Sequence, residues 1–264
     1  MEQSGKRLLD LTVVYSEREG RNGRLLKLRA QEELPDIMPG QFAEVLTDGH
    51  GSTLLRRPIS INFADRQRGE IWLLVAVVGE GTRWMASLPV GSRVNVLLPL
   101  GKGFTLPSDS GRKVLLAGGG VGVAPLLYLG AKLREKGISP TFLLGARSGE
   151  YLYERDLFEA LGRLFITTDD GSLGEKGVLT GHSILEKESF DFVYACGPKP
   201  MMEAVALYAD GKGIECEVSL ENKMACGLGA CLCCVEETRD GNVCVCTEGP
   251  VFNTKKLLWN KQKV

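Results

Sequence analysis

The chain has 264 residues, of which 44% are hydrophobic and 25% charged, and its formal net charge is −1. This length accommodates two ordinary domains with a small module, and the near-zero charge gives no electrostatic reason to bind nucleic acid or an anionic membrane. The N-terminal residues hold no apolar core of signal-peptide length, so we expect a cytoplasmic protein. In that reducing compartment, eight cysteines indicate metal or redox chemistry rather than disulfides.

The first hundred residues consist of short apolar runs punctuated by Gly, Pro and Asp, a pattern typical of antiparallel strands. One helix is expected over residues 81–88, and an antiparallel β-barrel is the natural closure of such strands. The polar, turn-rich residues 107–113 then mark a candidate boundary, which predicts a first domain over residues 1–108. The expected strands lie within residues 8–17, 25–30, 41–49, 58–65, 70–81 and 91–101.

From Val114 onward, apolar strands alternate with helical segments, which predicts a parallel sheet with helices on its faces. The charge-free stretch 114–131 contains five Gly and one Pro, so we interpret it as strand, turn and helix start rather than as a membrane span. This α/β domain is predicted over residues 109–214, followed by a cysteine-rich module over 215–264. The expected strands lie within 113–120, 141–148, 164–171 and 190–198, and the expected helices within 124–137, 151–162 and 199–213.

The cysteine-rich module contains the sharpest chemical pattern. Cys226, Cys231, Cys234 and Cys246 follow the spacing C-x4-C-x2-C-x11-C, whose opening matches the plant-type arrangement for a [2Fe-2S] cluster. Two glycines in the loop, at 227 and 229, let its backbone approach a cluster and direct N–H groups at the sulfurs. These four thiols are therefore the candidate metal ligands.

Zinc is the alternative metal, since Cys231 and Cys234 form a CxxC pair and Cys244 with Cys246 could supply the other two thiolates. In the iron–sulfur interpretation, Cys233 and Cys244 lie outside the cluster, and we expect them to fill a local core as small apolar residues. Cys216 is likewise expected to serve packing. The two histidines, His50 and His182, stand beside no convincing nucleophile, so no catalytic residue is assigned and both are expected at the surface.

Two short stretches of the barrel could hold a phosphate and a flavin. In "LRRPISI", Arg57 can form paired bonds to a pyrophosphate, Pro58 stiffens the approach, and Ser60 offers a hydroxyl to a flavin edge. In "GEGT", Gly79 and Gly81 free the backbone, and Thr82 is expected to cap the helix that begins there. Taken alone, an Arg-Pro dipeptide is most often a surface turn, and a Gly-x-Gly-Thr stretch is most often a hairpin or a helix cap.

Two turns in the α/β domain are candidates for binding a dinucleotide. "VLLAGGGVGVAPLL" runs from a strand into Gly118, Gly119, Gly120 and Gly122, followed by a Pro at a plausible first helical position. It departs from G-x-G-x-x-G, so an ordinary doubly wound enzyme is not the best match. "YACGPKPMM" would place Cys196, Gly197 and Pro198 at the carboxyl end of a strand, facing the nicotinamide. Tight turns without a ligand remain the alternative for both.

Taken in order, these stretches resemble the ferredoxin–NADP reductase superfamily with an appended cluster module. Between about residues 8 and 252, "RRPISI", "VVGEGT", "AGGGVGVAPL", "CGPKPMM", "MACGLGACLCC" and "CTEGPVF" look like the electron-transfer subunits of NAD-dependent, heteromeric dihydroorotate dehydrogenases. The resemblance implies a flavin-binding barrel, an NAD-binding α/β domain and a C-terminal [2Fe-2S] module. It implies FAD contacts at these residues: Arg57, Pro58, Ile59, Ser60, Leu74, Val75, Ala76, Gly81 and Thr82.

One departure from the family pattern concerns FAD. The family often has an aromatic and a basic residue where this chain has Val75 and Ala76, so a charged contact to FAD would be lost there or taken over by Arg56 or Arg83. The preference for NAD or NADP stays open, since Arg147 and Ser148 could meet a 2′-phosphate that Glu150 would repel.

The resemblance also implies a partner and a route. Electrons would pass from dihydroorotate through FMN on a separate catalytic subunit, across the cluster and FAD of this chain, to NAD⁺ in pyrimidine (UMP) biosynthesis. A heterotetramer with two copies of each subunit is implied, and an apolar docking patch is expected around Leu228 and Leu232, unless these pack into a local core. The alternatives are a subunit of another flavin and iron–sulfur reductase, of the ferredoxin:NADP or hydrogenase diaphorase type, or a non-catalytic zinc or redox-sensing nucleotide-binding module.

Overall fold

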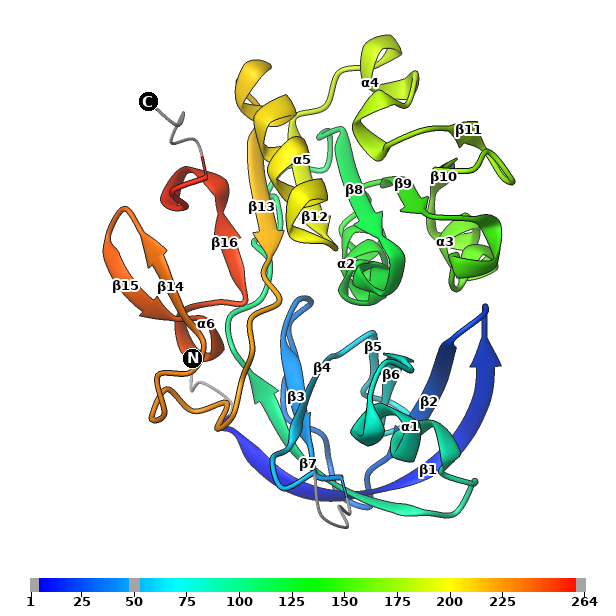
Figure 1. The fold of residues 1–264 in the computed structure, drawn as a ribbon, viewed down its shortest axis with the longest axis vertical. Coiled ribbons are helices and arrows are strands. Elements are labelled where there is room, and N and C mark those ends of the chain that lie inside the picture. Colours follow the sequence, from blue (N-terminus) through cyan, green and yellow to red (C-terminus); the bar gives the residue numbers. More distant parts are fainter. Residues whose placement is uncertain (1–4, 48–52, 260–264) are drawn as a thin grey trace.

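The computed structural model describes residues 5–47 and 53–259 of the chain. Two seven-stranded sheets and one two-stranded hairpin form its framework. The antiparallel sheet lies in the lower half of Figure 1, the parallel sheet lies above it, and the cysteine-rich hairpin lies beside them. No helix in the described ranges has the length and apolar character needed to cross a bilayer.

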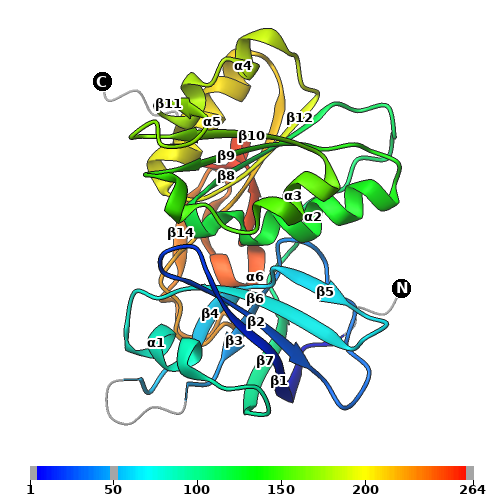
Figure 2. The same ribbon diagram turned by 90° about the vertical axis from the view of Figure 1, so that its right-hand side faces the viewer.

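The antiparallel sheet has the spatial order β4-β3-β7-β1-β2-β6-β5 and curls into a half-barrel, seen from the side in Figure 2. Alternate residues of its strands point inward, so that Leu11 and Val13 of one strand meet Leu26 and Leu28 of the next in a closed core. A short helix, α1 (Glu80–Ser87), buries Met85 against this core. The strands are β1 (Arg7–Glu19), β2 (Gly23–Arg29), β3 (Phe42–Val45), β4 (Arg57–Ser60), β5 (Phe63–Asp65), β6 (Glu70–Ala76) and β7 (Arg93–Leu100).

The second sheet has the order β11-β10-β9-β8-β12-β13-β16 and is parallel throughout except at the last pair. It confirms the predicted parallel α/β architecture. The strands are β8 (Val114–Gly119), β9 (Thr141–Ala146), β10 (Arg163–Thr168), β11 (Glu175–Lys176), β12 (Phe192–Cys196), β13 (Glu215–Ser219) and β16 (Val251–Asn253).

Helices cover both faces of the parallel sheet. On one face, α2 and α3 pack their apolar residues against Val114 and Leu116 of β8, and on the other, α4 and α5 pack against Leu115 and Ala117. Adjacent residues of one strand thus serve opposite cores, as its side-chain period of two requires. The helices are α2 (Ala124–Glu135), α3 (Arg155–Leu161), α4 (Ile184–Lys187) and α5 (Lys199–Gly211), and short 3₁₀ turns lie at Gly120–Val123, Gly149–Tyr151, Leu179–Gly181 and Thr254–Lys256.

The chain order within this sheet creates a place for a ligand. From β8 the chain builds outward through β9 and β10, then returns to the other side of β8 with β12 and β13. Loops leaving β8 and β12 therefore diverge at a topological switch point, where open α/β sheets bind ligands. The glycine-rich turn follows β8 and the "CGP" turn follows β12, so the two predicted dinucleotide turns lie next to each other.

The cysteine-rich segment is attached to this sheet. Its hairpin, β14 (Val235–Thr238) and β15 (Gly241–Cys244), is followed by α6 (Val245–Glu248), and β16 then pairs with β13. Strand β13, which begins directly after the predicted boundary at residue 214, belongs to the parallel sheet. The domain boundaries themselves stay predictions.

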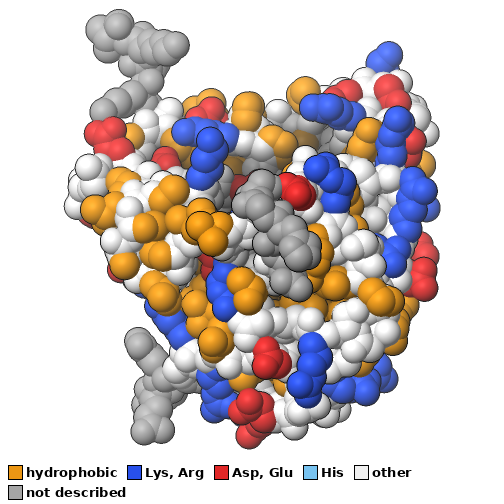
Figure 3. Space-filling view, turned by 60° about the horizontal axis from the view of Figure 1, so that its bottom comes forward, with side chains coloured by type: hydrophobic (Ala, Val, Ile, Leu, Met, Phe, Trp, Pro, Cys, Tyr) orange, Lys and Arg blue, Asp and Glu red, His pale blue; other side chains and the backbone are white. Residues whose placement is uncertain are grey.

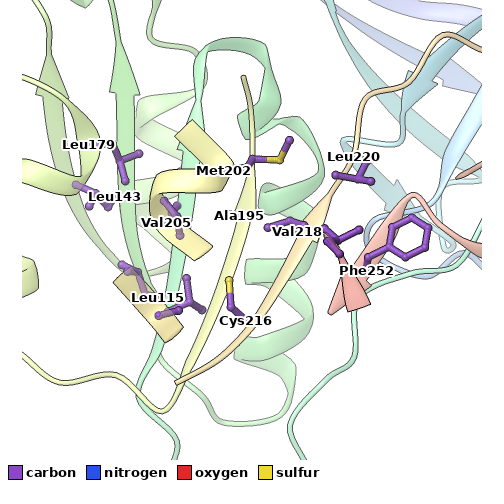
Figure 4. Packing of buried hydrophobic residues seen from close by; sticks show 14 of the residues in the cluster. Leu115, Leu143, Leu179, Ala195, Met202, Val205, Cys216, Val218, Leu220 and Phe252 are labelled. Carbon is purple, nitrogen blue, oxygen red and sulfur yellow. The ribbon is translucent and has the colours of Figure 1, made fainter. Parts of the chain in front are cut away.

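The packing predicted for Cys216 is confirmed. Its side chain is 1% exposed and lies among Leu115, Val218 and their neighbours (Figure 4). The surface position expected for His182 is wrong, because the ring is 6% exposed, packs edge-on to Phe165, and accepts a bond from the Ile184 N–H at the start of α4. His50 lies outside the described residues.

Candidate functional site

A cavity of about 520 Å³ lies between the half-barrel and the parallel sheet, and we call it the barrel pocket. Four consecutive residues of β4, the predicted flavin segment, form one wall, and residues from the switch point of the other sheet face them. The pocket thus joins segments that are far apart in sequence. Its predicted members are Arg57, Pro58, Ile59, Ser60, Leu74, Ala76, Thr82, Gly122 and Cys196.

Arg57 and Gly81 are brought together as a phosphate site would require. A Cβ at Gly81 would lie 2.8 Å from Arg57 Nε, so glycine there lets the guanidinium lie against the start of α1. Arg57 donates to the Leu55 carbonyl at 2.7 Å, which orients the side chain. A fixed guanidinium beside a helix N-terminus favours a pyrophosphate.

The capping role predicted for Thr82 is wrong in detail. Helix α1 begins at Glu80 with Gly79 as its N-cap, so Thr82 is the third helical residue. Its hydroxyl accepts the backbone N–H groups of Gly79 at 2.9 Å and Val78 at 3.0 Å. The side chain therefore reaches back to fix the loop before the helix, as the third residue of a capping box does.

Residues 74–76 of β6 divide between the pocket and the core. Leu74 and Ala76 line the barrel pocket, whereas the Val75 side chain packs into the half-barrel core, as strand alternation dictates. The guanidinium of Arg56, one candidate for the charged contact that this strand lacks, is engaged within the sheet. It bonds Asn95 Oδ1 and the carbonyls of Asn95 and Glu44.

A second cavity, of about 720 Å³, continues along the edge of the parallel sheet, and we call it the sheet pocket. Gly119, Gly120 and Pro198 line it, and Ala76 with Val78 line both pockets. Two ligands seated in these pockets would meet along that shared wall. Residues of the sheet pocket that the sequence interpretation did not select include Asn22, Tyr151, Tyr153 and Asp169; the last follows β10 and could have been found from its place at the carboxyl end of a strand.

The two dinucleotide turns touch through glycines. A Cβ at Gly122 would lie 2.5 Å from the Gly197 Cα, so the close approach of these backbones requires glycine at position 122. Gly118 has a different role, because a Cβ there would strike Val123 and Leu126 of the strand-to-helix packing. Helix α2 begins at Ala124, so Pro125 is its second residue and not its first.

Cys196 closes the side of the barrel pocket that faces the nucleotide turns. It is buried, and that burial raises the pKa of its thiol to about 12, so the group is neutral. It lines the barrel pocket, whereas Pro198, two residues later, lines the sheet pocket. The "CGP" turn therefore separates the two cavities.

A further wall of the barrel pocket, which sequence interpretation missed, is the segment after β13. Residues 219–224 line the pocket, and Cys226 follows two residues later. Asn222 anchors this segment to the cysteine module by donating to Glu236 Oε2 at 3.0 Å. The barrel pocket and the cysteine loop are thus connected by one short, fixed segment.

The cysteine loop directs backbone N–H groups at its sulfurs. The Leu228 N–H donates to Cys226 Sγ at 3.3 Å, the Gly229 N–H to Cys246 Sγ at 3.2 Å, and the Cys246 N–H to Cys234 Sγ at 3.4 Å. Such bonds stabilise thiolates and tune iron–sulfur clusters. Among the described residues, no three His, Cys, Asp or Glu side chains are grouped to hold a single metal ion. The fit to a cluster therefore rests on the loop and its N–H donors.

The backbone of this loop takes left-handed conformations, and the pKa values of its thiols are shifted. Gly227 and Gly229 have φ of +65° and +82°, and Leu232, with φ of +58°, takes a conformation that costs energy for a branched side chain. The N–H of Leu228 lowers the pKa of the Cys226 thiol to about 6, which favours the thiolate. Burial raises the pKa of the Cys246 thiol to about 12, so a bound metal would have to displace its proton.

Several other residues of the cysteine loop lie at the surface. Cys233 is exposed and Cys244 is half-buried, so the local-core role expected for Cys233 is wrong. Leu228 is 49% and Leu232 64% exposed, which confirms the expected apolar patch and excludes the local-core alternative for these leucines. Figure 3 shows hydrophobic side chains gathered on the left of the face that it presents.

One buried acid lies beneath the cysteine loop. Glu44 of β3 is fully buried, both its carboxylate oxygens lack a hydrogen-bond partner, and its Cγ lies 2.9 Å from the position that a Cβ on Gly227 would take. Burial raises the pKa of Glu44 to about 7. Because the side chain would clash with a Cβ at position 227, the loop can lie this close to β3 only with glycine there.

Comparison with known proteins agrees with this geometry. Residues 221–258 match the model of the iron–sulfur cluster binding domain of dihydroorotate dehydrogenase B. The electron transfer subunit of dihydroorotate dehydrogenase B (NAD(+)) from Shouchella clausii is 39% identical over an alignment of 254 residues, which covers 94% of this chain and 97% of that protein. The chain belongs to this family of electron transfer subunits. A second member, from Desulforamulus reducens, is 40% identical over 86% of this chain and 90% of its own length.

Solved structures place the fold among flavin-dependent reductases. A subunit of the NADH-dependent reduced ferredoxin-NADP oxidoreductase, described in a study of flavin-based electron bifurcation, superposes with a TM-score of 0.84 at 30% identity, covering 97% of this chain and 92% of that one. A cytochrome P450 reductase from Amycolatopsis superposes with a TM-score of 0.68 at 25% identity, covering 79% and 67%. The ferredoxin–NADP reductase-like fold expected from the sequence is confirmed.

Proposed function

We propose that this chain transfers electrons from an FMN-containing dihydroorotate dehydrogenase catalytic subunit to NAD⁺, for pyrimidine (UMP) biosynthesis. Membership of the family supports this role. The observation that carries it is the arrangement of three sites in one chain: two pockets that share a wall, and a cysteine loop joined to the first pocket by residues 219–224. When bound, FAD exchanges hydride with a nicotinamide and single electrons with a [2Fe-2S] cluster.

The protein's own residues hold and separate these groups. Arg57 and the start of α1 would bind the pyrophosphate of FAD, and Pro58, Ile59 and Ser60, which line the pocket, would hold its ring. Gly119, Gly120 and Pro198 would receive the dinucleotide in the sheet pocket. Gly122 and Gly197 approach each other closely, which holds the two dinucleotide turns together beside the pockets.

Cys226, Cys231, Cys234 and Cys246 would hold the cluster. The exposed Leu228 and Leu232 place apolar surface next to these ligands, where a redox partner has to approach within electron-transfer distance. No acid or base for dihydroorotate oxidation is assigned to this chain, and we place that chemistry on the catalytic subunit. We propose a heterotetramer with two copies of each subunit, located in the cytoplasm, where the cysteines outside the cluster would stay reduced.

A second function, as a subunit of another flavin and iron–sulfur NAD(P)H reductase, is favoured only by the structural likeness to the ferredoxin-NADP oxidoreductase. The partner distinguishes the two proposals. Copurification with a hydrogenase or glutamate-synthase-like subunit would support the second and contradict the first.

The proposal is tested by co-expressing the chain with an FMN-bearing catalytic subunit and measuring dihydroorotate-dependent NAD⁺ reduction. Leu232→Asp should abolish copurification and this activity but leave NADH oxidation by ferricyanide unchanged, because only the docking surface is altered. Leu207→Asp, at a similarly exposed leucine of α5, is the matched control. A complex that holds FMN, FAD and iron yet reduces no NAD⁺ would contradict the proposal.

A further inference from the structure

A buried polar pair connects the half-barrel to the parallel sheet. Asn62 lies two residues after the flavin segment of β4, is fully buried, and is tied to the half-barrel by its backbone N–H, which donates to the Trp72 carbonyl at 2.9 Å. Glu154 precedes α3 on the other side and is 5% exposed. Buried polar side chains are costly unless paired, so this contact between the two sheets is specific.

The Asn62 amide contacts two elements of the nucleotide side at once. Its Nδ2 donates to Glu154 Oε2 at 2.7 Å and to the Ala124 carbonyl at 3.2 Å. Ala124 is the first residue of α2, directly after the glycine-rich turn. A single side chain thus connects the segment that lines the barrel pocket with the turn that lines the sheet pocket.

Glu154 is held firmly at its end of the contact. Its backbone takes the left-handed conformation, with φ of +53°, which is strained for a residue with a Cβ. Its N–H donates to Glu19 Oε1 of the half-barrel at 2.8 Å. Strain of this kind persists where the surroundings impose it, so the carboxyl group is directed at Asn62 and not left to solvent.

We propose that Asn62 and Glu154 are positioning residues, which set the distance between the flavin segment and the dinucleotide turn and hence between the two reacting rings. The inference rests on the proposed function. Hydride transfer is sensitive to such spacing, because a displacement of about 1 Å can cost about 100-fold in rate. Neither side chain lines either pocket, so their effect has to pass through the segments that they connect.

The hydrogen-bonding groups of the Asn62–Glu154 pair are best satisfied when Glu154 is a neutral acid. Glu154 Oε1 and Asn62 Oδ1 are both buried without a hydrogen-bond partner, and a proton on Glu154 supplies the donor that the amide oxygen lacks. Burial raises the pKa of Glu154 to about 8, the Asn62 bond lowers it, and of the charged groups that face it, Glu19 of β1 raises it and Lys27 of β2 lowers it. The acid is therefore protonated at neutral pH and ionises above it.

The decisive variants are Asn62→Ala, Glu154→Gln and the control Arg21→Gln. The amide introduced by Glu154→Gln keeps one acceptor and one donor and so mimics the neutral acid, whereas Asn62→Ala removes the link. Arg21 forms an exposed ion pair with Glu150, which also joins the half-barrel to the parallel-sheet domain. Arg21→Gln therefore tests the loss of a contact between the same two parts of the molecule that is not buried. All are made in the full chain loaded with FAD and cluster.

The measurement is the limiting rate of flavin bleaching after rapid mixing with NADH, together with FAD and iron content. Asn62→Ala should lower the limiting rate about tenfold with FAD and iron content kept, while Glu154→Gln and Arg21→Gln stay within about twofold. As pH rises through about 8, the wild-type rate should fall and the Glu154→Gln rate should not, because only the carboxyl can ionise.

Two results overturn the inference. One is an Asn62→Ala protein that binds FAD and is reduced at the wild-type rate, which would make the pair merely structural. The other is a Glu154→Gln protein with the same pH-dependent loss as the wild type, and this arm decides the matter even if Asn62→Ala does not fold. A wild-type chain that holds FAD but is not reduced by NADH would refute the proposed function instead.

Discussion

The barrel pocket and the cysteine loop are built by opposite means. The pocket is assembled from stretches that are far apart in the chain, among them β4, β6, the glycine-rich turn and residues 219–224, and it lies between two packed sheets. The loop collects three of its four cysteines within nine residues, keeps Cys231 exposed, and positions the sulfurs with its own N–H groups. One site depends on tertiary packing and the other on local backbone geometry, and their responses to mutation should differ accordingly.

The largest expected effect separates the two regions outright. Cys231→Ser should lose nearly all iron, because a ligand of the cluster is removed, yet keep FAD, since no residue of the barrel pocket changes. Cys233→Ser is the matched control in the same loop and should keep both groups. Iron and flavin counts per chain are the measurement. Equal iron in both variants would show that the ligands are misassigned, and a joint loss of FAD would show that the regions are not independent.

A substitution in the barrel pocket should weaken FAD binding and leave the cluster in the cysteine loop intact. Arg57→Ala removes charge-assisted bonds to the pyrophosphate and should weaken FAD binding about 10- to 100-fold while iron content stays at the wild-type level. Arg68→Gln, at an exposed arginine of the β5–β6 turn, is the control. Fluorescence titration of the apoprotein with FAD measures the change. An unchanged affinity would remove Arg57 from the flavin site.

The sequence revealed more of the loop than of the pocket for a physical reason. Four cysteines with their glycines are local information that spacing alone can indicate, whereas Arg57 and Ser60, which share one strand, are assigned to FAD through the family resemblance. The Asn62–Glu154 contact spans 92 positions and is made by residue types that are usually exposed, so only packing reveals it. Residues 219–224 likewise line the pocket only because they follow β13 in the folded sheet. His182 is buried in a contact with Phe165 that the sequence does not reveal.

A smaller effect tests the contact between the two dinucleotide turns. Gly122→Ala would place a Cβ 2.5 Å from the Gly197 Cα, so the turns must separate, at a cost of about 1–3 kcal/mol in the free energy of unfolding. Gly79→Ala, where a Cβ meets nothing within 4 Å, should cost less than about 1 kcal/mol. Urea denaturation of both variants measures the difference. Equal costs would contradict the close approach.

The smallest expected effect is the contribution of Glu154, the buried acid between the two sheets, to the pH dependence of the free energy of unfolding. The raised pKa of Glu154 means that the folded chain holds a proton between pH 4.5 and about 8 that the unfolded chain releases, so the free energy of unfolding falls as pH rises through that range. Glu154→Gln should remove a slope of up to about 1.4 kcal/mol per pH unit. Glu44 and Glu217 also have raised pKa values, so the variant is compared with the wild type at each pH. Parallel pH curves would show that Glu154 is ionised in the folded chain.

The central claim, that one chain joins a flavin pocket to a cluster loop, is tested most directly by the visible spectrum of the anaerobically purified protein before and after NADH is added. The account predicts FAD and two irons per chain, as a [2Fe-2S] cluster requires, with both the flavin and the iron–sulfur absorption bleached by NADH. A protein that contains zinc and no flavin, or whose iron–sulfur absorption persists while the flavin is bleached, would contradict it.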